Sequence, residues 1–195
     1  MLPATRPNED MDIALLKKLL FRSESVQLVK IQCQEVQGKS PDFRIFENSQ
    51  EVGFCELKSP RDDDLAEEIN NPAYQGIASV NKDDPTFNKL GRHLKKAANQ
   101  FNSIDPNGDK IHILVVANHD DGADFSDIIT TMCGFEWYGR EKVKVNYEAA
   151  ISVSEAVIPT VDLIIYINAH TEELNYWENP DRPELACQAR QLAGL

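Results

Sequence analysis

Two almost unbroken apolar segments constrain the fold of this chain more than any other feature of its sequence. They are Ile111 to Ala117, IHILVVA, and Val161 to Ala169, VDLIIYINA. Each has the length of a strand and is apolar at nearly every position instead of at alternate positions, which is typical of a strand buried within a sheet. A sheet with such strands is covered by helices, so the chain is expected to be α/β.

Helix and strand patterns alternate in the rest of the chain. Amphipathic spacing predicts a first helix that begins near Asp10 or Asp12 and ends at Phe21, and a second over Thr86 to Ser103. Three more strands are expected at 26–36, 43–47 and 52–57, two shorter helices at 124–133 and 184–192, and an inserted loop or short helix at 61–85. The order α-β-β-β-α-β-α-β over residues 1–195 indicates a single α/β domain with a mixed sheet.

Composition narrows the classes of function. The net charge is -12, with 20 Lys and Arg against 32 Asp and Glu, which argues against a protein that merely coats DNA through phosphate contacts. An enzyme with a local basic surface remains compatible with this balance. The amphipathic N-terminal segment is neither a signal peptide nor a membrane span, and no apolar segment approaches the length that a bilayer requires, so no membrane association is expected.

The cysteines are scattered along the chain, with no C-x-x-C pair and no nearby histidine cluster. This spacing argues against structural zinc and favours a reduced, cytoplasmic setting. The four residues are Cys33, Cys55, Cys133 and Cys187.

The segment GKSPDFRIFENSQEVGFCELKSP, from Gly38 to Pro60, reads as a hairpin that carries charges where a sheet normally buries apolar residues. Glu56 and Lys58 are two apart and share one face of a strand. A loop with an odd number of residues, three (Asn48 to Gln50) or five, places Asp42 opposite Glu56 and brings the three charges together. A loop with an even number would put Asp42 on the other face.

Two neighbouring carboxylates with open coordination positions suit Mg²⁺, which prefers oxygen ligands and keeps several waters. Asp42 and Glu56 are the candidate ligands, and the backbone carbonyl of Leu57 is a further one. Such an ion polarises a phosphoryl oxygen and activates a water, and Lys58 could orient or deprotonate that water. The alternative is a surface hairpin in which Glu56 and Lys58 form an ion pair worth under about 1 kcal/mol.

These residues carry a resemblance to a known family. Pro41-Asp42, thirteen residues and then Glu56-Leu57-Lys58 resembles the signature of the PD-(D/E)XK nucleases. The resemblance implies a restriction-endonuclease-like αβββαβ core over residues 9–117, with 118–195 as a C-terminal elaboration. It also implies a metal-dependent endonuclease acting on DNA, with Asp42 and Glu56 as metal ligands, Lys58 as the catalytic lysine, and Mg²⁺, replaceable by Mn²⁺, as cofactor.

The helix at 86–103 has a basic flank beside its apolar stripe. Residues of this flank are spaced by three, four and seven: Lys89, Arg92, His93, Lys96 and Gln100. Members of the family often carry a polar residue on this helix that points at the active site, and Lys96 and Gln100 are the matching positions. A solvated helix face is the alternative.

The family also often has an acidic metal ligand on its first helix. Glu9 is the candidate here, with Glu24 as a second choice. The alternative function for the whole chain is a catalytically silent nuclease-like domain that binds nucleic acid or protein. A homodimer would suit cleavage of both strands of DNA, although no residue pattern establishes one.

Three other groups of residues are expected to form no functional site of their own. The acidic run after Ala117, which includes His119, Asp120 and Asp121, lacks EF-hand spacing and is expected to be a solvated loop before an Asp-rich helix start at Asp124. The acidic residues at 62–68 are expected to be a solvated face or a mobile flap. Four aromatic residues are expected to be core or packing residues instead of platforms for base stacking: Trp137, Tyr138, Tyr176 and Trp177.

Overall fold

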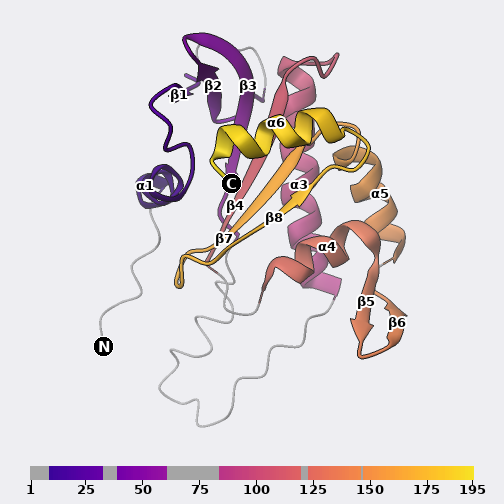
Figure 1. The fold of residues 1–195 in the computed structure, drawn as a ribbon. Helices are drawn as coiled ribbons and strands as arrows, with labels where there is room; N and C mark the ends of the chain where they lie inside the picture. The colour runs from indigo at the N-terminus through magenta and orange to yellow at the C-terminus, as the bar shows by residue number, and fades with distance from the viewer. Residues whose placement is uncertain (1–8, 33–38, 61–83, 120–122, 146) are drawn as a thin grey trace.

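The structure is a computed structural model that describes residues 9–32, 39–60, 84–119, 123–145 and 147–195. Its strands are β1 (Val26–Lys30), β2 (Phe43–Glu47), β3 (Gln50–Lys58), β4 (Ile111–Asn118), β5 (Phe135–Tyr138), β6 (Glu141–Lys144), β7 (Leu163–Asn168) and β8 (Leu174–Glu178). Its helices are α1 (Glu9–Leu19), α3 (Asp84–Ile104), α4 (Phe125–Cys133), α5 (Tyr147–Val157) and α6 (Pro183–Ala193). Figure 1 shows how these elements are arranged.

Within these ranges, six strands form a mixed sheet in the order β1-β2-β3-β4-β7-β8, and β5 and β6 form a separate hairpin. Strands β3, β4 and β7 run parallel to one another, while β1, β2 and β8 are antiparallel to their neighbours. The carboxyl ends of β3, β4 and β7 therefore meet at one edge of the sheet. The predicted α/β class with a mixed central sheet is confirmed.

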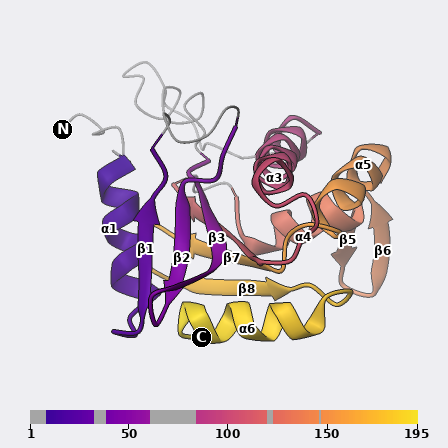
Figure 2. The ribbon, with the colours of Figure 1, turned by 90° about the horizontal axis from the view of Figure 1, so that it is seen from above.

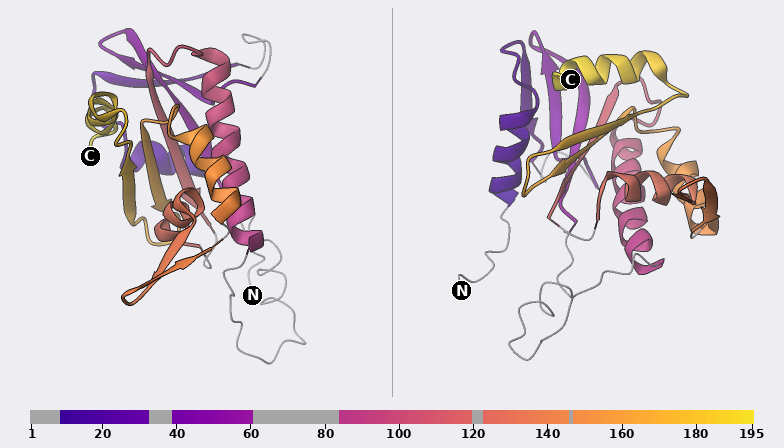
Figure 3. Two further views of the ribbon diagram at one scale, coloured as in Figure 1. Left: turned by 90° about the vertical axis from the view of Figure 1, so that its right-hand side faces the viewer. Right: turned by 60° about the horizontal axis from the view of Figure 1, so that its bottom comes forward.

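Helices cover both faces of the sheet. In β4, Ile113 and Val115 belong to the core under α1 and α6, while Leu114 and Val116 belong to the core under α3, α4 and α5. Figures 2 and 3 show the sheet twisting strongly between these two helix layers. This burial on both faces explains why β4 and β7 are apolar at nearly every position.

Elements with clear periodicity were predicted correctly and the weaker ones were missed. Helix α5 lacks charge contrast between its faces, because Tyr147 and Ile151 are exposed while Ala150 and Val153 are buried. The short edge strand β8 and the hairpin β5–β6 were not predicted either. Of the four aromatic residues expected in core or packing positions, Trp177 packs against the core under α3, whereas Tyr176 lies on β8 and is 41% exposed. The side chains of Trp137 and Tyr138 lie outside the described set.

Two further expectations concern membrane association and the cysteines. None of the described helices is both long and apolar enough to cross a bilayer. Cys55, Cys133 and Cys187 are free thiols, and Cys33 lies outside the described residues. Of the insertion predicted at 61–85, residues 61–83, with the acidic run at 62–68, lie outside the described residues, and the last two belong to α3.

The turn between β2 and β3 has two residues, so the expected loop of three or five was wrong. Asn48 and Ser49 both have positive φ, 49° and 69°, as a tight two-residue hairpin turn requires. The pairing then shifts by one residue between Ile45 and Phe46, from Phe46–Glu51 to Ile45–Gly53, so that Val52 is an extra residue in β3. This bulge restores the alignment that an even loop alone would have lost.

Glycine is required directly after the bulge. Gly53 pairs with Ile111 where β3 meets β4, and a Cβ at this position would lie 2.4 Å from the Ile111 carbonyl oxygen. The bulge and the glycine together fix which face of β3 each later side chain occupies. They consequently decide that Glu56 and Lys58 face α3.

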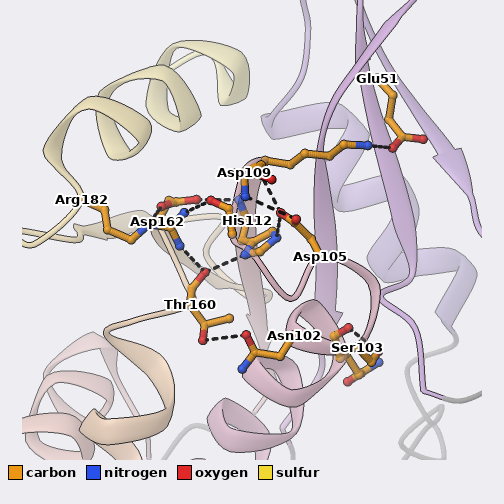
Figure 4. A network of polar contacts seen from close by, with 12 residues as sticks. Glu51, Asn102, Ser103, Asp105, Asp109, His112, Thr160, Asp162 and Arg182 are labelled. Atoms are coloured by element: carbon orange, nitrogen blue, oxygen red, sulfur yellow. Dashed lines mark hydrogen bonds and ion pairs between the residues drawn. The ribbon is translucent and has the colours of Figure 1, made fainter.

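A buried polar cluster, which we call the clasp, lies where β4 and β7 begin (Figure 4). It consists of Asp105, His112, Asp162 and Arg182. The ring of His112 stacks on Phe101 with centroids 4.7 Å apart, its Nδ1 donates to the Thr160 carbonyl (2.7 Å), and its Nε2 lies 3.1 Å from Asp105 Oδ2. Burial lowers the pKa of His112, which therefore favours the neutral ring.

The clasp joins α6 to the sheet through its second acid. Asp162 is 0% exposed and accepts a hydrogen bond from the backbone N–H of His112 (2.7 Å), while Arg182 Nε lies 3.1 Å from its other oxygen. Arg182 also donates to the carbonyls of Thr160 (3.0 Å) and Gly108 (2.7 Å). Burial raises the pKa of Asp162 to about 6, although the His112 N–H and the Arg182 charge oppose that rise. The cluster is enclosed and its polar groups bind mainly to the backbone.

Candidate functional site

A pocket of about 350 Å³ lies at the carboxyl end of β3, at the opposite end of the sheet from the clasp. Helix α1 and helix α3 border it, and the hairpin β2–β3 forms its floor. Its polar lining consists mainly of Asp12, Asp42, Glu56, Lys58, Lys96 and Gln100. The pocket therefore gathers the charged residues that the sequence singled out in the hairpin.

Asp42 and Glu56 lie next to each other, one residue beyond the last β2–β3 pair, Phe43 with Cys55. The backbone N–H of Asp42 donates to Glu56 Oε2 (3.0 Å), and the backbone N–H of Leu57 donates to Asp42 Oδ2 (2.9 Å). Each carboxylate thus fixes the other strand's backbone at the end of the ladder. The bulge at Val52 is the cause, because without it Asp42 would align with Cys55.

Lys58 enters the pocket from the same face of β3 as Glu56. Its Nζ contacts Glu56 Oε1 and donates to Gln100 Oε1 (2.9 Å). Gln100, on α3, donates in turn to the backbone carbonyl of Ser40 (2.7 Å). Glu56, Lys58 and Gln100 are 1%, 8% and 6% exposed, so the Glu56–Lys58 pair is almost completely shielded from solvent. Gln100 of α3, itself bonded to the Ser40 carbonyl, holds the lysine in place.

The electrostatics of this cluster depend on burial. Burial raises the pKa of Glu56 to about 7; the Lys58 ammonium opposes that rise and the neighbouring Asp42 adds to it. Beneath them, burial and the same two carboxylates raise the pKa of the Cys55 thiol, so Cys55 is an inert core residue here. A buried acid whose pKa lies near neutrality is poised to lose its proton to a cation.

The oxygen atoms present suit a hard cation. Among the described residues no donor reaches the second oxygen of Asp42, Oδ1, which leaves it available as a ligand. The Leu57 carbonyl points to the β2 side, because its own N–H bonds Asp42 there and both groups of a strand residue share one edge. No group of three or more His, Cys, Asp or Glu side chains converges as a ready metal cage within the described ranges. Mg²⁺ often needs only one or two carboxylates.

The acid that α1 contributes to the pocket is Asp12, which was expected only near the start of this helix. It is 2% exposed and lines the pocket, with Oδ2 accepting from Ser59 Oγ (2.6 Å) and Oδ1 lying 2.7 Å from His119 Nε2. The helical period could have pointed to Asp12, since it lies on the buried side with Leu16. His119 could not have been found, because only the parallel pairing of β3 and β4 brings it to Ser59.

Of the two acids proposed from the sequence for this position, only Glu24 has a side chain within the described set. Glu9 begins α1, and its side chain lies outside the described set. Glu24 is exposed and precedes β1, next to Ser25, whose carbonyl accepts from Asn48 N in the hairpin turn. Because Asn48 and Asp42 lie at opposite ends of β2, Glu24 is remote from Asp42 and was the wrong choice.

The basic flank of α3 reaches the pocket in part. Lys96 and Gln100 line it as expected, and His93 lines it as well. Burial lowers the pKa of His93, with the positive charge of Lys58 as the next cause, so a neutral ring is favoured. Arg92 and Lys96 are exposed, and Lys89 is half-buried. The flank is therefore a mixture of pocket lining and solvated surface.

The Asp-rich helix start expected at the end of the acidic run after β4 is present. Asp124 caps α4 by accepting from the N–H groups of Ser126 (2.8 Å) and Asp127 (3.3 Å), and the Asp127 side chain accepts in return from the Asp124 N–H (2.7 Å). This is a reciprocal capping box. Asp120 and Asp121 lie outside the described residues.

Comparison of the chain with protein-family models, with curated proteins and with solved structures finds no match. What the pocket does must accordingly be argued from its own chemistry.

Proposed function

We propose that the protein is a metal-dependent nuclease of the PD-(D/E)XK type with a restriction-endonuclease-like core, and that it hydrolyses phosphodiester bonds in DNA. The observation that supports the proposal is the pairing of half-buried Asp42 with buried Glu56, with Lys58 beside them, at the open end of a sheet strand. Glu56 and Lys58 are buried together, and burying two ionisable groups costs free energy that their mutual pairing offsets only in part. Loops and strand ends of this kind also commonly carry active sites.

The residues present fit Mg²⁺ or Mn²⁺ through three oxygens: Asp42 Oδ1, one oxygen of Glu56 and the Leu57 carbonyl. A bound cation would supply Lewis-acid polarisation of the phosphate and a lowered pKa for an attacking water. With Glu56 serving as a metal ligand, the Lys58 ammonium would no longer be held in its ion pair and would be free to face the phosphate. Lys58 would then orient the water or stabilise charge on the phosphate oxygens.

The surrounding residues would hold this arrangement in place. Gln100 fixes the Lys58 amine and is itself fixed by the Ser40 carbonyl. Asp12, held by Ser59 and His119, is the acid on α1 that would support the site, in place of Glu9. Lys96 is exposed at the rim, where it could contact a phosphate of the backbone.

Cleavage of supercoiled plasmid with Mg²⁺, Mn²⁺ or EDTA tests the proposal. Wild-type protein is expected to nick DNA only with the metal, and Lys58→Ala and Asp42→Ala should both abolish nicking. Lys17→Ala is the matched control, since Lys17 is an exposed lysine of α1 that does not line the pocket. Metal-dependent nicking that survives both pocket substitutions would contradict the assignment.

A catalytically silent binding domain is the second candidate, and one observation favours it. Both oxygens of Glu56 are already engaged, by the Asp42 N–H and by Lys58, as they would be in a cluster that serves only to hold the strands together. Under that alternative the wild-type protein binds nucleic acid and cleaves none under any metal condition. Pairing of two copies to cut both strands stays a prediction.

A further inference from the structure

The hairpin β5–β6 sorts its charges onto two faces. Phe135 pairs with Lys144, and Glu136 pairs with Val143. Because side chains alternate along a strand, Lys142 and Lys144 share the face that carries Phe135, while Glu141 shares the opposite face with Val143. A short hairpin in a chain of net charge -12 thus presents one face whose charges are basic.

The basic face is also aromatic. Lys142 Nζ lies 3.7 Å from the Phe135 ring centroid, and Lys144 Nζ lies 4.7 Å from the ring centroid of Tyr147, at the start of α5. The two rings are themselves 5.2 Å apart and inclined at 61°. We call these four residues the lysine–aromatic face.

This face is open to solvent. Both lysines are exposed, Tyr147 is 37% exposed and Phe135 is half-buried. Arg140 follows Gly139 in the turn of the same hairpin, and a Cβ at Gly139 would meet no atom within 4 Å. Figures 1 and 3 show the hairpin extending outward from the layer of α4 and α5. It is therefore accessible to an extended polymer as well as to solvent.

We propose that the lysine–aromatic face binds a single-stranded segment of nucleic acid. Its lysines would contact phosphates, and its rings would stack on unpaired bases, the combination that sequence-tolerant single-strand binding uses. An acidic peptide would satisfy the lysines but would have no use for the rings. The inference rests on the proposed function, since it places a second contact for the same class of substrate away from Lys58.

Fluorescence anisotropy with a labelled single-stranded oligonucleotide, in EDTA so that no cleavage occurs, tests the inference. Lys142→Gln/Lys144→Gln is expected to make the slope of log Kd against log salt concentration shallower by about 1.4, at roughly 0.7 for each lost phosphate contact. The control Lys17→Gln/Lys18→Gln makes the same change in charge on α1 and should leave the slope unaltered. Lys142→Arg/Lys144→Arg should keep the wild-type slope.

The rings are tested separately. Tyr147→Leu should weaken binding by about fivefold or more without changing the salt slope, because stacking involves no counterion release. A measurement that needs no variant accompanies it: the oligonucleotide should protect Lys142 and Lys144 from acetylation, read by mass spectrometry, and should leave Lys17 reactive.

An unchanged salt slope in Lys142→Gln/Lys144→Gln together with full acetylation of both lysines in the complex would overturn the inference. So would binding of a polyglutamate peptide as tight as that of the oligonucleotide. These outcomes are separable from failure of the proposed function. Lysine-dependent binding without any metal-dependent cleavage overturns the nuclease assignment alone, whereas cleavage with no contribution from this hairpin overturns only the present inference.

Discussion

The pocket cluster (Asp42, Glu56, Lys58 and Gln100) and the clasp lie at opposite ends of the same sheet, and each contains a buried acid whose pKa burial raises. In the clasp, Asp162 is enclosed and is met by a backbone N–H and a guanidinium that also binds two carbonyls. In the pocket, Glu56 lines a cavity of about 350 Å³. Each acid has a second carboxylate near it, Asp42 beside Glu56 and Asp105 near Asp162, so the cavity is what distinguishes the two clusters. On our proposal, burial of an acid does not by itself mark a chemical site, whereas burial next to an open pocket does.

The largest effect is expected for cleavage by Lys58→Met. Removing the amine should lower the rate constant by about 10³-fold, as loss of a transition-state contact does. Folding should be little affected, because Glu56 without Lys58 can take up a proton in place of its ion pair. Single-turnover cleavage with a Lys17→Met control measures the change. Wild-type rates in Lys58→Met would remove the lysine from the mechanism.

The clasp should behave in the opposite way. Arg182→Ala leaves Asp162 buried without its guanidinium and is expected to lower the free energy of unfolding by about 3 kcal/mol while sparing the cleavage rate of the folded protein. Urea denaturation measures this. Arg190→Ala is the matched control, because the Arg190–Glu178 pair is partly exposed and should contribute much less to stability than the buried pair of the clasp. An equal decrease in the free energy of unfolding of the two variants would show that the clasp does not stabilise the fold.

Glu56 and Asp162 should also affect the stability of the fold over different ranges of pH. In metal-free protein the pKa of Glu56 is about 7 against an ordinary 4.5, so the folded state keeps a proton that the unfolded state releases. The stabilising contribution is complete below pH 4.5 and is lost as pH rises through 7, about 3 kcal/mol in all. For Asp162 the corresponding window runs from about 3.8 to about 6.

Urea denaturation in EDTA at several pH values measures both contributions. Glu56→Gln should remove the fall in stability between pH 6 and 8, and Asp162→Asn should not. Parallel stability curves for wild type and Glu56→Gln would show that Glu56 ionises as an ordinary surface acid does.

The smallest effect is expected at Gln100. Gln100→Ala removes the acceptor that holds Lys58, and a loss of about tenfold in cleavage rate corresponds to roughly 1.4 kcal/mol, the worth of one charged hydrogen bond. The neighbouring Asn99 is exposed, so Asn99→Ala is the control on the same helix. If both variants cleave like wild type, the Gln100 bond does not position the amine.

The features that were predicted correctly depend on residues close to one another in the sequence. The apolar segments of β4 and β7 follow from burial and the Asp-rich start of α4 follows from its orphan backbone N–H groups, and both features were predicted. The approach of Asp42 to Glu56 was predicted for the wrong reason, since the turn has two residues and the bulge at Val52 corrects the alignment. The meeting of Asp12, Ser59 and His119 could not be predicted, because it depends on the order of strands in the sheet.

Isothermal titration of Mn²⁺ at pH 8 tests the central claim most directly, namely that Asp42 and Glu56 share one divalent cation. The account predicts one site for each wild-type chain, affinity at least about tenfold weaker in Asp42→Asn and in Glu56→Gln, and unchanged affinity in Asp162→Asn. Equal Mn²⁺ binding in all four proteins, or none in the wild type, would contradict it.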